Sequence, residues 1–238
     1  MKNQYWQGIL HLNAKPSMKS LFSIFSFLFI ATLFVACGGP EGEKVEAEDA
    51  VETTETTAAD AVTYNVDRGA SQIVWTGAKP TGTHTGTVSI SDGKLMVADG
   101  NITGGEFMLD MGSITVTDLK PGEGKEDLEG HLKTGDFFEV EKYPSGKFVI
   151  TGATPVSGNG DVTHNLTGNL TMKNTTKSVT IPVNVAVMDN KISAQSKAFK
   201  IDRTEWGINY NSGSLADTAK DKIINDEIGL VVTLVANK

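Results

Sequence analysis

Cysteine is almost absent from this chain, because its 238 residues contain only Cys37. A single cysteine excludes an intramolecular disulfide. An excess of positive charge is also missing, since the formal net charge is −8. Proteins that bind nucleic acids present a basic face, so this charge argues against a nucleic-acid partner. Proline is scarce, with 7 residues, and 39% of the residues are hydrophobic. The chain is therefore expected to form one globular domain with tails, at roughly 100–200 residues per domain.

The usual sequence signatures of catalysis and of metal binding are missing as well. His84, His131 and His164 do not show the HxH or HExxH spacing of metal ligands. There is no GxSxG turn, and no glycine-rich phosphate loop joins a strand to a helix. Three acidic residues between positions 136 and 141 are flanked by lysines, which is typical of a solvated face. We therefore expect a protein that is not an enzyme and holds no metal.

The N-terminal 37 residues read as an export signal. An apolar run covers residues 22–36, and Met18-Lys19 precedes it. A basic start before a hydrophobic core of this length is typical of a secretory signal, and the run is short for a membrane span. Residues 1–17 lack this pattern, so Met18 is the expected start of translation.

The apolar run ends in Phe34-Val35-Ala36-Cys37-Gly38. A small residue before a lone cysteine at this place resembles the lipobox of bacterial lipoproteins. The resemblance implies cleavage before Cys37, a diacylglyceryl group on its thiol and anchoring in the bacterial cell envelope, at a periplasmic or outer-membrane face. The alternative is an ordinary secreted protein with one leftover cysteine. The sequence does not decide which membrane leaflet is used.

Residues 38–62 differ in composition from the rest of the chain. They contain eight acidic residues, one lysine and no aromatic residue. Such a segment buries too little apolar surface to offset the entropy lost on ordering. We expect a disordered acidic linker that holds the domain away from the membrane.

Residues 63–238 contain short alternating runs separated by Gly, Asn and Asp. Asp92-Gly93 and Asp99-Gly100 are both strong hairpin signals. Pro182 lies within the clearest alternating run, where it cannot donate a ladder hydrogen bond, which predicts a bulge or an edge. About eight or nine short-looped strands indicate an all-β fold, either a sandwich or a barrel. The single interrupting helix favours an antiparallel barrel of about eight strands.

One stretch, residues 127–151, interrupts this β pattern. Leu128, His131 and Leu132 are spaced i, i+3 and i+4, which predicts a short helix ending at Gly135. The pair Phe137-Phe138 follows directly. The predicted fold is thus a barrel with one short helical excursion, which we interpret as a flap near one mouth. Pattern alone favours a filled core over an apolar channel.

Residues 131–144, HLKTGDFFEVEKYP, resemble the signature of the YceI-like, polyisoprenoid-binding family. Further matches follow the family's order along the chain, and the resemblance covers residues 63–238. It implies a lipocalin-like barrel whose apolar channel takes an isoprenoid or another long-chain amphiphile, and it reverses the preference for a filled core. The matching segments are residues 64–67 with 71–75, 168–173 with 176–183, 201–207, and 226–228.

The resemblance makes a small set of residues candidates for ligand binding, each with a structural alternative. The aromatic candidates line the channel or fill the core; they are Trp75, Phe137, Phe138, Phe148 and Trp206. His131 meets a ligand head group or caps a buried hydrogen bond. Arg203 orients a polar head group, as its planar fork allows, or forms an ordinary ion pair.

Two functions of different classes follow. The first is a membrane-tethered barrel that stores, carries or protects a long-chain isoprenoid, with no cofactor other than a bound isoprenoid or quinone-like lipid. The second is a filled barrel on a tether that binds another protein and has no small-molecule ligand. The sequence leaves open the identity of the ligand and whether the chain forms a homodimer.

Overall fold

The computed structural model describes residues 39–53, 60–157, 160–214 and 220–238. The predicted signal sequence, Met18 and Cys37 lie outside these residues. No helix within the described ranges is both long and apolar enough to cross a membrane.

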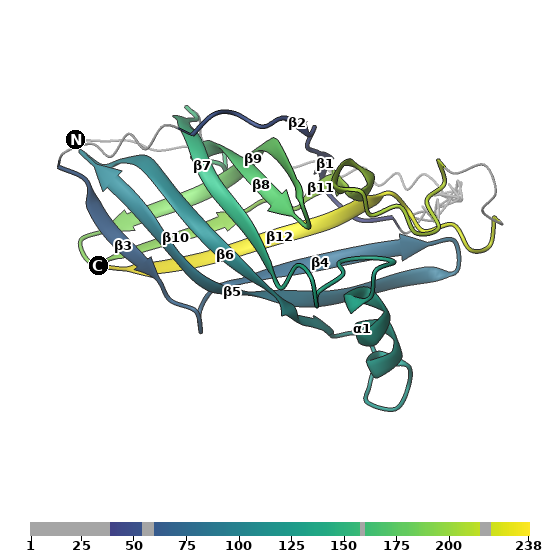
Figure 1. Cartoon of the computed structure of the whole chain (residues 1–238). Coiled ribbons are helices and arrows are strands. Elements are labelled where there is room, and N and C mark those ends of the chain that lie inside the picture. The colour runs from purple at the N-terminus through teal and green to yellow at the C-terminus, as the bar shows by residue number, and fades with distance from the viewer. Residues whose placement is uncertain (1–38, 54–59, 158–159, 215–219) are drawn as a thin grey trace, which may run out of the picture. The chain divides into compact units, whose positions relative to one another are not determined.

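The described chain is mostly β-structure with one α-helix (Figure 1). In order, the elements are β1 (Glu43–Lys44), β2 (Glu48–Asp49), β3 (Val62–Val66), β4 (Gln72–Lys79), β5 (Gly82–Ala98), β6 (Asn101–Val116), α1 (Lys125–Lys133), β7 (Ser145–Pro155), β8 (His164–Met172), β9 (Thr175–Met188), β10 (Lys191–Ser196), β11 (Phe199–Asp202), the 3₁₀ turn η1 (Arg203–Trp206) and β12 (Glu227–Asn237).

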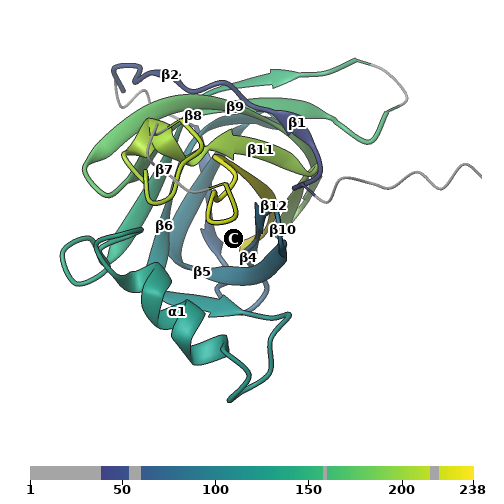
Figure 2. The ribbon, with the colours of Figure 1, turned by 90° about the vertical axis from the view of Figure 1, so that its right-hand side faces the viewer.

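Eight of these strands close into a ring. The order is β4, β5, β6, β7, β8, β9, β10 and β12, and β12 pairs again with β4. Every neighbouring pair in the ring is antiparallel. Figure 2 looks along the ring from the end where α1 lies. This arrangement confirms the predicted all-β, lipocalin-like fold of about eight strands with one helical excursion.

Alternation of side chains fixes which face of each strand points inward. In β9, Val183 and Val185 are buried whereas Asn184 and Ala186 are exposed. Pro182 sits where the partners of β9 change, because pairing with β10 begins at Val183. The predicted bulge or edge is not found, because β9 lies between β8 and β10, but the proline stands at the end of the β9–β10 pairing, where its missing N–H costs no ladder bond.

One of the two predicted hairpins is wrong. The chain does turn at Asp99-Gly100, where both residues have positive φ, at 51° and 76°. That conformation is the one that a tight hairpin requires. Asp92-Gly93, in contrast, lies inside β5, next to a register shift in its pairing with β6. Glycine is needed there because a Cβ would lie 2.7 Å from Cδ1 of Phe107, not because the chain turns.

The helix α1 has the predicted face but a slightly different end. It stops at Lys133, and Thr134 adopts an extended conformation with its backbone N–H donating to the His131 carbonyl. Gly135 therefore does not supply a left-handed end. The helix is attached to the ring through Glu129, whose Oε1 accepts from Thr115 Oγ1 at 2.5 Å and from the Val116 N–H at 2.8 Å.

Residues 39–53, which were predicted to belong to a disordered linker, lie on the outer wall of the ring. We call them the strap. β1 pairs in parallel with β11, and β2 pairs antiparallel with β9. Val45 and Ala47 pack against the core. The composition-based prediction fails for these residues because the edges of β11 and β9 offer unpaired backbone groups that the strap satisfies.

Candidate functional site

The ring encloses an apolar cavity of about 680 Å³. This is within the range of pockets that hold small molecules, roughly 300–1,000 Å³. The wall is made of inward-facing aliphatic, methionine and aromatic side chains from all eight strands of the ring, with additions from β11 and α1. The ring is therefore not filled by its own side chains, and the filled-core alternative does not describe it.

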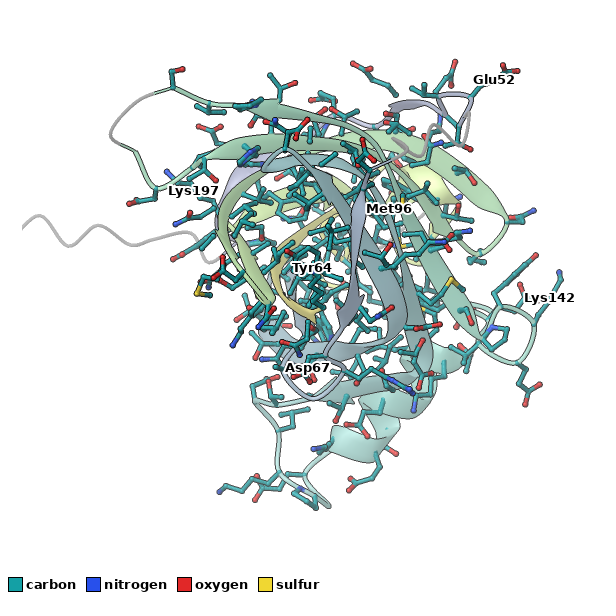
Figure 3. All side chains as sticks on the ribbon, turned by 90° about the vertical axis from the view of Figure 1, so that its left-hand side faces the viewer. Glu52, Tyr64, Asp67, Met96, Lys142 and Lys197 are labelled. Carbon is teal, nitrogen blue, oxygen red and sulfur yellow. The ribbon has the colours of Figure 1, made fainter. Side chains whose placement is uncertain are left out.

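One end of the cavity is closed. Tyr64 of β3 is 5% exposed and its hydroxyl donates to the Asp189 carbonyl at 3.3 Å. Figure 3 views the ring from this end, with Tyr64 labelled inside it. Ile192 and Ala236 are fully buried and do not belong to the cavity lining. Ala194, two residues from Ile192 on β10, does belong to it. The cavity thus ends near Ala194.

The other end, which we call the mouth, is surrounded by three loops and α1. The loops are the β4–β5 turn, the β6–α1 connection and the described residues 207–214 and 220–226 (Figures 1 and 2). Nearly all polar side chains of the lining belong to these elements: Lys79, His84, Asp127, His131, Tyr210, Asn211, Asp221 and Lys222. The cavity is therefore apolar in its depth and polar at its mouth.

His131 stands at this mouth in a small aromatic cluster. Its ring centroid lies 5.1 Å from that of Phe137 and 4.9 Å from that of Tyr210, both edge to face. Its Nε2 is 2.9 Å from Oδ2 of Asp136. The sequence placed His131 on the correct helical face, and the structure gives it a carboxylate partner together with a position in the lining. Tyr210 was missed, because nothing in the pattern of residues 207–222 marks it.

A second histidine–carboxylate pair lies on the same rim. Nδ1 of His84 is 2.9 Å from Oδ2 of Asp118, and Oδ1 of Asp118 accepts from the Thr85 N–H at 2.8 Å. Partial burial alone would raise the pKa of Asp118, but the bonds from Thr85 and His84 outweigh it and hold this pKa below its ordinary value. Asp118 is therefore a carboxylate at neutral pH and fixes the orientation of His84.

Four aromatic candidates line the cavity: Trp75, Phe137, Phe138 and Phe148. Two of them pack against glycines of the neighbouring strand. The Trp75 ring covers Gly86, and the Phe148 ring covers Gly168, so that a Cβ on either glycine would overlap the ring. These glycines let bulky side chains rest on the wall and leave the centre of the ring open.

Trp206 does not line the cavity, in contrast to the prediction. It is 1% exposed, and its Nε1 donates to the Leu170 carbonyl at 3.0 Å. The 3₁₀ turn η1 thereby attaches to β8, and Trp206 belongs to the buried core. The sequence identified an important aromatic residue here but not the side of the wall that it occupies.

Arg203 contacts the lining, but its guanidinium is occupied by the protein. Nε donates to the Asn225 carbonyl, Nη1 to the Ile208 carbonyl, and Nη2 to the Ile224 carbonyl and to Oδ1 of Asp226, at 2.7–3.2 Å. Burial lowers the pKa of Arg203, while Asp226 and Asp202 oppose that shift. Arginine stays charged under all ordinary conditions. Arg203 therefore joins Ile208 to residues 224–226, as in the ion-pair alternative, and is not free to orient a head group.

No group of three or more metal-ligating side chains is found in the part of the chain that the structure describes. The lining also holds one deep hydroxyl, that of Ser196. Its Oγ accepts from the Val232 N–H at 2.8 Å, so this hydroxyl joins strands β10 and β12. The site offers an apolar volume and a polar rim.

Comparison with known proteins agrees with this geometry. A family model described as the YceI-like domain matches residues 64–236. A UPF0312 protein of Pseudomonas putida is 38% identical over 85 residues, which are 34% of this chain and 42% of the relative. A UPF0312 protein of Pseudomonas aeruginosa is 37% identical over 68 residues, 29% of this chain and 34% of the relative. The alignments thus span less than half of these curated relatives.

Two solved structures share the fold. BcnA of Burkholderia cenocepacia has a TM-score of 0.53 and 22% identity, and the alignment covers 72% of this chain and 99% of BcnA. A polyisoprenoid binding domain from Saccharophagus degradans, implicated in plant cell wall breakdown, has a TM-score of 0.51 and 15% identity, with 73% and 97% covered. At these identities the similarity establishes the fold alone.

Proposed function

Because the chain belongs to the YceI-like domain family, we propose that it binds a long-chain amphiphile, an isoprenoid or a related lipid, inside the ring. The observation that carries the proposal is the distribution of polarity. The cavity is apolar from Ala194 to the helix, and its polar side chains gather at the mouth. A ligand with an apolar tail and one polar end matches this distribution, with the tail inside and the polar end at the mouth.

The energetics favour such a ligand. Each methylene group that leaves water for an apolar site contributes about 0.8 kcal/mol. A tail of ten buried carbons therefore gains on the order of 8 kcal/mol, which offsets the loss of translational and rotational freedom on association. The isoprenoid class is supported by the fold that the chain shares with the polyisoprenoid binding domain of Saccharophagus degradans.

The cellular setting belongs to the same proposal. The lipobox-like sequence before Cys37 supports an acylated envelope protein, in which the ring stores, carries or protects its ligand. Acyl chains of this kind anchor firmly when two or more are present. A binding role needs no catalytic step, and none is assigned.

Extraction of the purified protein with organic solvent, followed by mass spectrometry, tests the ligand. We expect a long-chain molecule near equimolar amounts, or uptake of added prenol or quinone by the empty protein. If the extract contains no such molecule and neither compound binds, the carrier role is wrong and the interaction-module alternative is favoured.

Membrane fractionation of a Cys37→Ser variant tests the anchor separately. The variant should leave the membrane fraction, whereas the unaltered protein stays in it. Retention of the variant with membranes would show that acylation of Cys37 is not what holds the protein there.

A further inference from the structure

The strap is held to the outer wall by a series of specific contacts. The Val45 N–H donates to the Lys200 carbonyl at 2.7 Å. Farther along, the side-chain amide of Asn169 binds both backbone groups of Val51, accepting from its N–H at 3.0 Å and donating to its carbonyl at 2.7 Å. Asn169 is a buried residue, so this reciprocal pair is a built attachment point. The strap therefore has a fixed path along the wall.

The first residues of the strap lie beside the mouth. Pro40 is buried against Gly229, where a Cβ would lie 2.7 Å from Cβ of the proline. A Cβ on Gly39 would lie 3.8 Å from Nδ2 of Asn225. The Asn225 N–H in turn donates to the carbonyl of Ala78, a residue of the cavity lining near the β4–β5 turn. The chain thus enters the described structure at the mouth end of the ring.

Cys37 is two residues before Gly39. Two residues span at most about 7 Å, since an extended chain advances by roughly 3.3–3.6 Å per residue. The backbone of Cys37, to which any acyl chains are attached, therefore lies within about 7 Å of Gly39, beside the mouth. From this geometry we propose that the mouth of the cavity faces the surface of the lipid bilayer and exchanges ligand with it directly.

This inference rests on the proposed acylation of Cys37. It adds that the anchor fixes the orientation of the ring on the membrane. A flexible linker of 25 residues would have allowed the ring any orientation and a distance from the membrane. With the strap docked, only Gly38 separates the anchor from the fixed part of the chain. A ligand leaving the cavity then meets lipid first, so that an apolar tail does not have to cross water between membrane and protein.

The rim is compatible with a bilayer surface. Leu119 and Leu128 are half-buried side chains of the lining on the mouth side. Among the charged residues of the lining at the rim, Lys79 and Lys222 are matched by Asp127 and Asp221. The affinity of the protein for the membrane comes from the acyl anchor, and the strap sets the orientation of the ring on the membrane.

Fluorescence quenching by brominated lipids tests this orientation on the full acylated chain. Cys37 is the chain's only cysteine, and acylation blocks its thiol, so a second cysteine can be labelled alone. We would place a dye at the mouth with Lys222→Cys, or at the closed end with Lys191→Cys. Both positions are exposed. In vesicles of brominated phosphatidylcholine, the fluorescence of the dye at position 222 should be strongly quenched. The fluorescence of the dye at position 191 should be the same as in vesicles without bromine.

The length of the tether supplies the decisive comparison. Insertion of a flexible Gly/Ser segment of about twelve residues after Gly38 should abolish the difference between the two dyes, because such a linker spans about 17–21 Å on average. The same segment inserted after Thr53, behind the docked strap, should leave the difference intact. The first insertion should also slow ligand transfer from vesicles without changing the affinity of the ring.

The outcomes separate this inference from the function on which it rests. Equal quenching at 222 and 191 in protein whose Cys37 carries acyl chains by mass spectrometry would overturn the orientation and leave the anchor standing. Absence of the acyl mass would overturn both. Quenching that survives the insertion after Gly38 would show that the strap does not set the orientation. Failure of the cavity to bind any lipid would be seen in the extraction experiment alone.

Discussion

Filling the closed end of the cavity should shorten the ligand that the protein can bind. Ala194 is half-buried on β10 and contributes to the lining where the cavity ends. An Ala194→Phe side chain would extend into empty volume, so the wall need not move. The usual overpacking cost of about 1–3 kcal/mol should therefore be largely avoided.

The expected loss of affinity follows from the carbons that are displaced. The phenylalanine ring occupies the space of about five methylene groups, each of which contributes about 0.8 kcal/mol. The longest ligands should lose about 4 kcal/mol, roughly a thousandfold in affinity. Short ligands that do not reach Ala194 should bind as before. In the unaltered protein, affinity should rise about fourfold per added methylene until the cavity is full.

A series of straight-chain alcohols, titrated against a displaceable fluorescent probe, measures both effects. The matched control is Ala186→Phe, because Ala186 lies on the neighbouring strand β9 and is exposed to solvent. Its affinity profile should equal that of the unaltered protein. Unchanged binding of the longest alcohols by Ala194→Phe, or a flat profile in the unaltered protein, would refute the internal binding mode.

Three further changes test the supporting structure. Arg203→Ala leaves Asp226 and three carbonyl groups without their donor and should lower the free energy of unfolding by about 3–5 kcal/mol in a urea titration. Gly42→Ala should release the strap, since Gly42 has φ of 108° and a Cβ would overlap the Ala198 backbone. Cleavage of the strap by a glutamate-specific protease should then be faster. The control Gly39→Ala should leave the rate of cleavage unchanged. Hydrogen bonds from Thr115 and Val116 lower the pKa of Glu129, so its stabilisation of α1 is complete above its unfolded pKa of about 4.3 and is lost as pH falls through the lower folded value. The protection factor of the Val116 amide against hydrogen exchange, corrected for the intrinsic rate at each pH, should therefore fall in acid, and Glu129→Gln should remove most of that pH dependence.

Much of the fold was determined by local patterns. Alternation of apolar and polar residues indicates the strands wherever one face is buried, as at Val183 and Val185. The i, i+3, i+4 spacing of Leu128, His131 and Leu132 identified the helix and the face it turns to the cavity. These patterns predict the elements correctly because they depend only on residues within one helix or strand.

Other features depended on partners far away in the chain, and the sequence did not reveal them. Asp92-Gly93 has the composition of a hairpin, yet the glycine is needed for the approach of Phe107. Trp206 is an aromatic residue of the kind that lines apolar channels, yet its hydrogen bond to the Leu170 carbonyl holds it away from the cavity. In both cases the deciding contact joins residues of different elements, which composition does not encode.

The sequence by itself predicted an all-β domain and its helical excursion, and it offered five aromatic candidates for the lining without deciding between channel and core. Tertiary structure decided between a filled core and an open ring, and it placed Gly86 and Gly168 where the Trp75 and Phe148 rings occupy the space of a missing Cβ. It also decided the course of the acidic strap, since unpaired strand edges of β11 and β9 order a segment whose own composition favours disorder.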